Sequence, residues 1–373
     1  MTEYHQAYKG KTVLVTGGAG AIGSNLVKAL AECEAKCVIV LDNFSSSYRW
    51  NVPNLPNMML VEGDVSDEIV LKRVFFEKPS VVFHLAAFFA NQNSIDYPDR
   101  DIATNGIGTL KMLQYSTMAG VDRFVYASSG CSIYGSKAPL PLKEDFMSMN
   151  LSTPYQITKM LGELYCNFFY NHYGTPVVKA RFFNSYGPGE VPGQYRNVIP
   201  NFIYWAMKGQ ALPITGTGEE TRDFTYVGDL VDGLLRSGCL DAAVGEQFNL
   251  ASSVETRIID LATMINELTG NKAGIKFASR RKWDNKSRLW ASVERAEKVI
   301  GYKPKIVFEE GLKTAIAWFR EKWELIDVSA SFNPGMSSAV RDKVASPLEG
   351  RTIEIVDAES PTKAPKKSTH HIG

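Results

Sequence analysis

An α/β fold built on a doubly wound parallel sheet is the fold class that this sequence predicts. Short runs rich in β-branched residues alternate with stretches of helical periodicity over the first half of the chain. The first run passes directly into a glycine-rich loop, and beyond residue 186 glycines and prolines become frequent. The alternation indicates right-handed β-α-β crossovers, and the later change in composition indicates a smaller α+β lobe.

The composition is that of a globular protein with little net charge. Of the 373 residues, 45% are hydrophobic, and the formal net charge of +1 argues against a nucleic-acid partner. No apolar run reaches membrane-spanning length, and residues 1–10 lack the apolar stretch of a signal peptide. The five cysteines are few and scattered, so we expect a reduced, cytoplasmic protein that does not bind membranes.

Histidine is scarce in the body of the chain. Only His84 and His172 lie away from the termini. This argues against a histidine-based triad and against a multi-histidine metal site, so we expect no metal centre. Acid and base catalysis must then fall to tyrosine, lysine, cysteine or carboxylates, and His84 is expected to pack inside the protein.

The first predicted strand, residues 11–16, leads into a loop with the features of a dinucleotide site. Glycines 17, 20 and 23 allow a tight turn, a close approach to a ligand and close packing of helix on strand. The helix that follows offers free N–H groups and its positive dipole end to a diphosphate. The next strand, 37–41, ends in Asp42, and an acid there favours NAD over NADP because it accepts hydrogen bonds from a ribose. These features are typical of a Rossmann domain.

Further strands continue the alternation. Residues 59–65 form a third strand with Asp64 near its end, and residues 81–87 form a fourth whose small residues allow a cofactor to pass close by. A helix is expected around residues 105–110, followed by a buried strand at 124–127. In such sheets the ligand crevice lies at the carboxyl ends of the strands.

The candidate acid–base group follows the 124–127 strand. Tyr155 and Lys159 are four residues apart at the start of an amphipathic helix, so their side chains lie on one face. An ammonium beside a phenol favours the phenolate, and a hydroxyl at the strand end, such as Ser129, could share the same substrate oxygen. This arrangement can take a proton from an alcohol while its carbon loses a hydride.

The second half of the chain predicts a lobe for the substrate. After a strand at 177–183, arginines on separate loops could converge on phosphate groups. We expect residues 1–185 to form the NAD-binding domain, with 225–262 returning to it. Residues 186–224 and 263–327 form the substrate lobe, with a last helix at 311–323. Residues 328–373 are rich in Ser, Pro, Lys and Ala, and are expected to be mostly disordered.

Several motifs together give a specific resemblance over roughly residues 10–325. They are Gly17-x-x-Gly-x-x-Gly23, Asp42-Asn43, Asp64, His84-Leu-Ala-Ala, Asn105-x-x-Gly-Thr-Leu, Tyr155-x-x-x-Lys159, Arg181-Phe-Phe-Asn184-x-Tyr-Gly-Pro and Arg222-Asp-Phe. The chain resembles the extended short-chain dehydrogenases/reductases, and among them the nucleotide-sugar epimerases and dehydratases typified by UDP-galactose 4-epimerase.

The resemblance implies a role for each matching residue. Tyr155 would be the general base, Lys159 would bind the nicotinamide ribose and lower the pKa of the tyrosine, and Ser129 would bind the reacting hydroxyl. NAD would be held by Gly17, Gly20, Ala21, Ile22, Gly23, Asp42, Asn43, Asp64, Val65, Leu85, Ala86, Ala87, Asn105, Tyr155 and Lys159. The nucleotide sugar would be bound by Ser129, Asn184, Arg196, Asn197, Val198, Arg222, Asp284 and an arginine at 280 or 281, with Arg281 preferred.

One segment departs from the family pattern. The loop from Ser129 to Tyr134 is one residue longer than expected in 4-epimerases, and it lacks the acids of related dehydratases and decarboxylases. Cys131 stands near the place of those acids, where GDP-mannose 3,5-epimerase has a cysteine. A thiol there could move a proton at C5. That enzyme also uses a lysine, whose expected position is held here by Val198, so we do not adopt its reaction.

The resemblance therefore predicts an NAD-dependent 4-epimerase acting on a UDP-hexose, hexosamine or uronic acid. Alternatives are a related dehydratase, decarboxylase or C5-acting epimerase that uses Cys131. An NAD-binding regulator without catalytic activity is a further alternative, although the intact Tyr155 and Lys159 count against it. By analogy we expect a homodimer formed through the helices at 106–118 and 156–169.

Overall fold

A seven-stranded parallel sheet forms the centre of the protein, as predicted. The structure is a computed structural model that describes residues 4–280, 284 and 286–332. The strand order is β11-β6-β5-β4-β1-β2-β3, and every neighbouring pair is parallel. The strands are β1 (Thr12–Thr16), β2 (Cys37–Asp42), β3 (Met58–Glu62), β4 (Val81–His84), β5 (Arg123–Ser129), β6 (Val177–Phe182) and β11 (Gln247–Leu250). The order reverses between β1 and β4, which opens a ligand crevice at their carboxyl ends.

Helices cover both faces of the sheet, which explains why its strands are apolar on both sides. One face packs against α2 (Ala21–Glu32), α10 (Val227–Cys239) and α12 (Glu294–Ile300). The other face packs against α3 (Glu68–Phe76), α6 (Thr109–Ala119) and α8 (Pro154–Tyr173). His84, at the end of β4, is buried as predicted and bonds the hydroxyls of Thr16 and Thr109.

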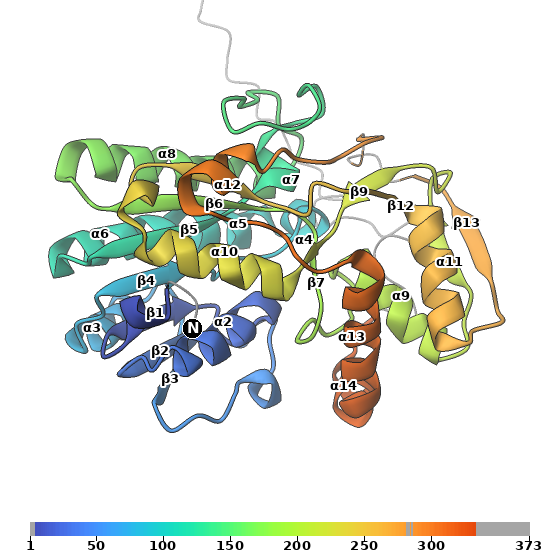
Figure 1. Ribbon diagram of the computed structural model, residues 1–373, viewed down its shortest axis with the longest axis horizontal. Coiled ribbons are helices and arrows are strands. Elements are labelled where there is room, and N and C mark those ends of the chain that lie inside the picture. Colours follow the sequence, from blue (N-terminus) through green and yellow to red (C-terminus); the bar gives the residue numbers. More distant parts are fainter. Residues whose placement is uncertain (1–3, 281–283, 285, 333–373) are drawn as a thin grey trace, which may run out of the picture.

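A second, smaller lobe lies beside the carboxyl ends of the strands (Figure 1). Its apolar cluster joins α9 (Val198–Met207), α11 (Ile258–Thr269), α13 (Phe308–Glu321) and α14 (Trp323–Ser329). Three two-stranded pairs accompany these helices: β8 (Leu212–Thr215) with β13 (Ile275–Ala278), β9 (Thr221–Asp223) with β12 (Glu255–Arg257), and β7 (Ser185–Tyr186) with β10 (Thr225–Tyr226).

Short helices complete the described chain. They are α1 (His5–Tyr8), η1 (Arg49–Asn51), α4 (Asn91–Asp96), α5 (Pro98–Asp101), α7 (Gly130–Ile133) and η3 (Asp241–Ala243). The helix expected around residues 105–110 is a π-helical segment, η2 (Ile102–Gly108), that continues into α6. None of the helices in the described part of the chain is long and apolar enough to cross a membrane.

The packing adds two details to the predicted domain boundaries. β11 pairs with β6, so the chain returns to the sheet within residues 225–262. However, α11 contributes Leu261, Ala262 and Ile265 to the second lobe, and α12 contributes Ala296 and Ile300 to the sheet core. Apart from residues 328–332, the tail expected to be disordered lies outside the described residues.

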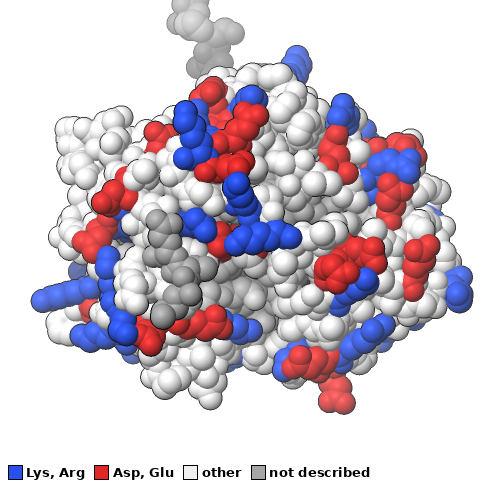
Figure 2. Space-filling model, viewed as in Figure 1, with Lys and Arg blue, Asp and Glu red and all other residues white. Residues whose placement is uncertain are grey.

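Charged side chains of both signs are interspersed over the face drawn in Figure 2. This distribution agrees with the formal net charge of +1. Since no broad basic area is visible on this face, the view gives no support to a nucleic-acid surface.

A buried ion pair fixes α8 against the sheet. Arg181 on β6 donates from Nε and Nη2 to the two carboxylate oxygens of Glu163 on α8, at 2.9 and 2.8 Å. Both side chains are 2% exposed. Arg181 Nη1 also donates to the Tyr134 hydroxyl, and the Ser128 hydroxyl donates to Glu163. The pair therefore joins β5, β6, α8 and the segment after α7, and the carboxylate beside it raises the pKa of Arg181 against the effect of burial.

Removing one partner of this pair should destabilise the whole domain. We expect Arg181→Met to lower the free energy of unfolding by about 3–5 kcal/mol, because the Glu163 carboxylate is left buried without its partner. Urea denaturation followed by circular dichroism measures the change. Arg257→Met, which removes an exposed arginine paired with Asp260, is the matched control and should change the stability much less. Equal effects of the two substitutions would contradict this role of the pair.

Candidate active site

A cavity of about 420 Å³ lies between the carboxyl ends of the strands and the second lobe. Its lining includes almost every residue predicted for the site. These are Gly17, Gly20, Ala21, Ile22, Gly23, Asp42, Asn43, Asp64, Val65, Leu85, Ala86, Ala87, Ser129, Cys131, Tyr155, Lys159, Asn184, Arg196, Asn197, Val198, Arg222 and Asp284. Arg281 lies outside the described residues.

Asn105 does not line the cavity but is buried behind its wall. Its side chain accepts a hydrogen bond from the Phe88 N–H at 2.8 Å and donates to Asp101 at 2.8 Å. The oxygen of the amide therefore holds the segment after β4, and its nitrogen binds α5. The structure thus gives Asn105 a supporting position instead of the direct cofactor contact that the motif implied.

The glycine loop brings the backbone of β1 close to that of the segment after β4. Gly17 has a φ of +69°, and a Cβ there would lie 2.8 Å from the Ala86 nitrogen. At Gly23, a Cβ would lie 2.2 Å from the Gly17 oxygen, so helix α2 can start here only with glycine at this position. The first N–H groups of α2 are left for a ligand, which suits an anionic diphosphate.

Acidic side chains stand at the ends of β2 and β3. Asp42 accepts hydrogen bonds from the Ala19 N–H at 3.0 Å and the Ser47 hydroxyl at 2.7 Å. Asn43 donates to Asp64 at 2.7 Å. Burial acts to raise the pKa of Asp64, but hydrogen bonds from Ser66 and Asn43 outweigh it and lower that pKa below its ordinary value. Both acids are fixed at the edge of the cavity, where the hydroxyls of an adenosine could meet them.

The first turn of α8 presents Tyr155 and Lys159 to the cavity. Thr153 caps the helix by accepting from the Gln156 N–H, and Pro154 occupies its first position. The Lys159 ammonium donates to the Ala127 carbonyl at 2.9 Å and lies 5.7 Å from the centre of the Tyr155 ring. The Tyr155 hydroxyl meets the Ser129 hydroxyl at the end of β5. The three predicted groups therefore converge from two elements.

Burial dominates the protonation of this pair. It raises the pKa of Tyr155 well above its ordinary value, and the Ser129 hydrogen bond offsets only part of this. It also lowers the pKa of Lys159 to about 8, against the opposing effect of Asp101. The prediction that the ammonium lowers the pKa of the tyrosine is therefore not met by the protein groups alone, because both groups are removed from water.

Cys131 lies beside these groups on the short helix α7. Burial raises the pKa of its thiol, so the neutral form is favoured. Lys286, from the segment before α12, donates from its ammonium to the Cys131 carbonyl oxygen at 2.5 Å. The position at which GDP-mannose 3,5-epimerase would have its lysine is held by Val198. A different lysine, Lys286, reaches the turn that carries Cys131 from a distant part of the chain.

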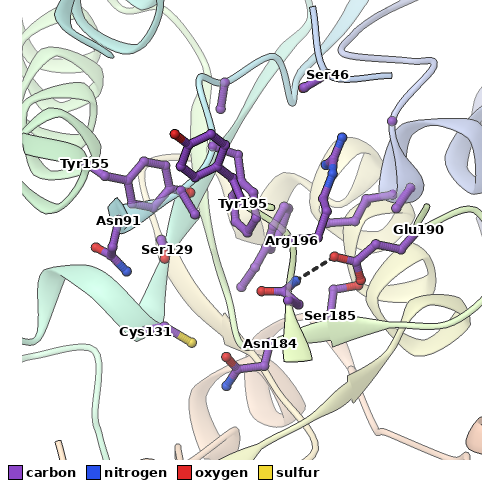
Figure 3. A pocket seen from close by; sticks show the side chains of 18 of the residues that line it. Ser46, Asn91, Ser129, Cys131, Tyr155, Asn184, Ser185, Glu190, Tyr195 and Arg196 are labelled. Atoms are coloured by element: carbon purple, nitrogen blue, oxygen red, sulfur yellow. Dashed lines mark hydrogen bonds between the residues drawn. The ribbon is translucent and has the colours of Figure 1, made fainter. Parts of the chain in front are cut away.

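The second lobe supplies the opposite wall of the cavity (Figure 3). Helix α9 begins at Val198, so its N-terminus faces the cavity and can bind an anion. The Asn184 amide donates to the Asp223 carbonyl at 2.8 Å, which leaves its own oxygen free to accept. Arg222 pairs with Asp284 at 2.8 Å, whereas Arg196 forms no side-chain hydrogen bond or ion pair with any described residue.

Among the cavity-lining residues that sequence reasoning missed are Glu190, Tyr195 and Lys286. Glu190 stands two positions after the Tyr-Gly-Pro motif and accepts from Asn197 at 2.9 Å. Its place near a motif was a usable signal. Tyr195 is held by Asp96 across 99 positions of the chain, and Lys286 reaches Cys131 across 155, so neither contact leaves a local pattern.

Comparison with known proteins identifies the family of this chain. Residues 13–251 match the model of the NAD dependent epimerase/dehydratase family, and the chain belongs to this family. It is 34% identical over 313 residues to a UDP-glucose 4-epimerase of Mycolicibacterium smegmatis, covering 83% of this chain and 98% of the relative. It is 32% identical over 321 residues to UDP-glucuronic acid decarboxylase 1 of Xenopus tropicalis, covering 84% and 73%.

Solved structures agree with this assignment. An epimerase of Methanothermobacter thermautotrophicus is 55% identical, with a TM-score of 0.87 over 88% of this chain and 98% of that one. The enzyme WbmF of Bordetella bronchiseptica, in complex with NAD+ and UDP, is 35% identical (TM-score 0.77; 87% and 96% covered). A UDP-N-acetylglucosamine 4-epimerase of Methanobrevibacter ruminantium, in complex with UDP-N-acetylmuramic acid, is 30% identical (TM-score 0.78; 84% and 99% covered).

NAD is the cofactor of this protein, and the described residues fit it. A Cβ at Gly17 or Gly23 would strike the backbone of the chain, so the tight turn between β1 and α2 requires glycine at both positions. The N-terminus of α2 would hold that diphosphate, Asp42 the adenosine ribose, and Lys159 the nicotinamide ribose.

Glu190 should make cofactor binding depend on pH. Burial raises the pKa of Glu190 to about 7, against the lowering effects of Arg196 and Asn197. A raised carboxyl pKa means that the neutral form dominates below pH 7 and that negative charge appears in the cavity above it. We expect the affinity for NAD+, which carries a diphosphate, to fall by about tenfold from pH 6 to 8.

Calorimetric titration of the cofactor-free protein with NAD+ tests this expectation. Lys159 also loses charge near pH 8, so the informative quantity is the difference from Glu190→Gln, which should have a flatter profile. Glu324→Gln, on exposed α14, is the control and should behave like the wild type. Parallel profiles for wild type and Glu190→Gln would refute the assignment.

Proposed function

We propose that this protein is an NAD-dependent nucleotide-sugar 4-epimerase whose substrate is a UDP-linked hexose, hexosamine or uronic acid. The convergence of Tyr155, Ser129 and Lys159 on one cavity is the observation that carries the proposal. Such a group can remove a proton from a secondary alcohol. The cavity also reaches the N-terminus of α9 and Arg222, which suit the diphosphate of a nucleotide sugar.

In this proposal the protein groups handle the proton of the sugar C4 hydroxyl. Tyr155 accepts that proton, and Ser129 hydrogen-bonds the same oxygen so that it faces the phenol. NAD+ supplies the hydride chemistry, accepting and returning the hydrogen on C4. Because burial keeps Tyr155 protonated in the protein alone, its activation needs positive charge nearby, which the Lys159 ammonium and the nicotinamide ring both carry.

Binding through the nucleotide follows from this chemistry. The 4-keto sugar must turn over so that its other face meets the hydride, and tight contacts to the ring would oppose this motion. Affinity therefore has to come from the part of the substrate that does not react. Asn184, Asn197, Val198, Arg222 and Asp284 line the part of the cavity formed by the second lobe and are our candidates for that contact.

One observation favours a second candidate function, a C5-acting epimerase. The ammonium of Lys286 bonds the Cys131 carbonyl and so lies near the thiol of that residue, and a cation near a thiol can assist proton transfer. Against it, Lys286 bonds the Cys131 carbonyl and burial favours the neutral thiol. We therefore rank 4-epimerisation first.

A homodimer formed through α8 and the continuous helical segment of η2 and α6 is also part of the proposal. Ile157, Leu164 and Phe168 lie on one face of α8 and are 54%, 51% and 48% exposed. Ile102 and Ile107 on η2, which packs against α8, are exposed as well. A contiguous apolar surface of this kind is unusual on a monomer, and a second copy of the same surface would cover it.

Replacing the general base should abolish turnover without unfolding the protein. We expect Tyr155→Phe to lower kcat by about 10²–10⁴-fold, because the phenol alone can accept the C4 proton. Chromatography of UDP-glucose and UDP-galactose after incubation measures the rate, and circular dichroism checks the fold. Tyr173→Phe, at the exposed end of the same helix, should keep full activity.

Cys131→Ser separates the two candidate reactions. A 4-epimerase needs no thiol and should retain most of its activity after this substitution. Loss of turnover in Cys131→Ser together with unchanged turnover in Tyr155→Phe would reject the 4-epimerase mechanism in favour of the C5-acting one.

A charge on the apolar face should split the dimer. We expect Phe168→Asp to sediment as a monomer where the wild type sediments as a dimer, because burying an unpaired carboxylate is costly. Met149→Asp, at an exposed position away from α8, should remain dimeric. A wild type that is monomeric at every concentration tested would refute this interface.

A further inference from the structure

Lys286 is a partly buried cation without an acidic partner. Its ammonium donates to one neutral acceptor, the Cys131 carbonyl, and no described carboxylate lies within 4 Å of it. Asp284 is near enough to influence it but is already paired with Arg222 at 2.8 Å. Burial lowers the pKa of Lys286 to about 8, so it is still largely protonated at neutral pH. A buried positive charge is costly unless a ligand brings the matching anion.

The direction of the side chain shows where that anion would sit. The Lys286 carbonyl accepts from the Arg222 guanidinium at 3.2 Å, while its ammonium reaches the Cys131 carbonyl at 2.5 Å. The side chain therefore runs from the arginine expected at the diphosphate toward the turn that follows Ser129. Its charge ends at the Cys131 carbonyl, and Cys131 is two positions along the chain from Ser129.

The chemistry of a hexuronate matches this place. In the proposed reaction the C4 hydroxyl must meet Tyr155 and Ser129, and the carboxylate of a uronic acid is attached at C5, the neighbouring carbon. The carboxylate is therefore attached to the carbon next to the one that bears the reacting hydroxyl. Cys131 is two positions beyond Ser129, and Lys286 bonds its carbonyl.

We propose that Lys286 selects nucleotide sugars that carry a carboxylate on the hexose, so that the substrate is a nucleotide-linked hexuronate. The ammonium forms a charge-assisted hydrogen bond with that carboxylate and keeps its bond to the Cys131 carbonyl. A neutral hydroxymethyl group at the same position leaves the ammonium without a counter-charge. This proposal rests on the proposed 4-epimerase function and makes its substrate class specific.

Substrate preference tests the proposal. Initial rates are measured for UDP-glucuronate and UDP-galacturonate and for UDP-glucose and UDP-galactose, with the wild type and with Lys286→Met. We expect the wild type to prefer the uronates, and Lys286→Met to lower kcat/KM for them by about 10–100-fold while changing the neutral sugars little. Lys286→Arg should restore much of the preference, and Lys276→Met, on exposed β13, should act like the wild type.

Lys286 could bind either the carboxylate of the sugar or the diphosphate of the nucleotide. Calorimetric titration with UDP, which has only the diphosphate, distinguishes the two. If Lys286 contacts the sugar carboxylate, UDP binds Lys286→Met and the wild type equally well. A loss of UDP affinity, together with an equal loss for all four sugars, would overturn the proposal and assign Lys286 to the diphosphate. A wild type without preference for uronates would also overturn it.

Failure of the 4-epimerase function can be recognised separately. If none of the four sugars is converted, that function is wrong, whereas the binding of UDP-glucuronate and UDP-glucose to the wild type and to Lys286→Met still tests the role of the lysine. In that case, tighter binding of UDP-glucuronate that is lost in Lys286→Met supports the selection of a carboxylate. Equal binding of both sugars refutes it.

Discussion

The ion pair between Glu163 and Arg181 holds α8, the helix that carries Tyr155 and Lys159, against the sheet. A parallel sheet brings strand ends together, but it does not by itself decide how far α8 slides along the sheet. Two charge-assisted hydrogen bonds at 2.8 and 2.9 Å fix that register, and the Ser128 hydroxyl ties the end of β5 to the same carboxylate. Tyr155 lies two turns before Glu163 on α8, and Ser129 directly follows Ser128. This buried interaction therefore helps to set the position of Tyr155 relative to Ser129, together with the bonds that Lys159 and Tyr126 make between α8 and β5.

The cavity that this interaction shapes contains several ionisable groups removed from water. Burial favours the neutral forms of Tyr155 and Cys131, and it lowers the pKa of Lys159 and Lys286 to about 8. Arg196 forms no ion pair with the described residues, and Lys286 bonds only a neutral carbonyl. Positive charge is therefore available for ligands that bring negative charge. A nucleotide sugar and a dinucleotide, both with diphosphates, meet this condition.

Local patterns predicted the sheet, and most of the residues they indicated for the cofactor line one cavity. The glycine loop, the acid at Asp42 and the Tyr155–Lys159 spacing each depend on residues close together in sequence, so their geometry follows from the period of a strand or helix. Asn105 matched a motif but supports the Phe88 backbone from behind the wall. Lys286 could not be found, because its contact with Cys131 depends on how a distant loop folds back. The protonation of Tyr155 also escaped prediction, since burial depends on the whole fold.

The central claim is that the proton of the C4 hydroxyl and the hydrogen bonded to C4 both leave and return during the reaction. Isotope tracing tests it most directly. The enzyme is incubated with a UDP-hexuronate deuterated at C4 in ordinary water, and with the unlabelled sugar in D₂O, and the products are resolved by NMR. The account predicts that deuterium remains on C4 through inversion and that no solvent deuterium enters at C5. Deuterium from the solvent at C5, or loss of the label from C4, would contradict it.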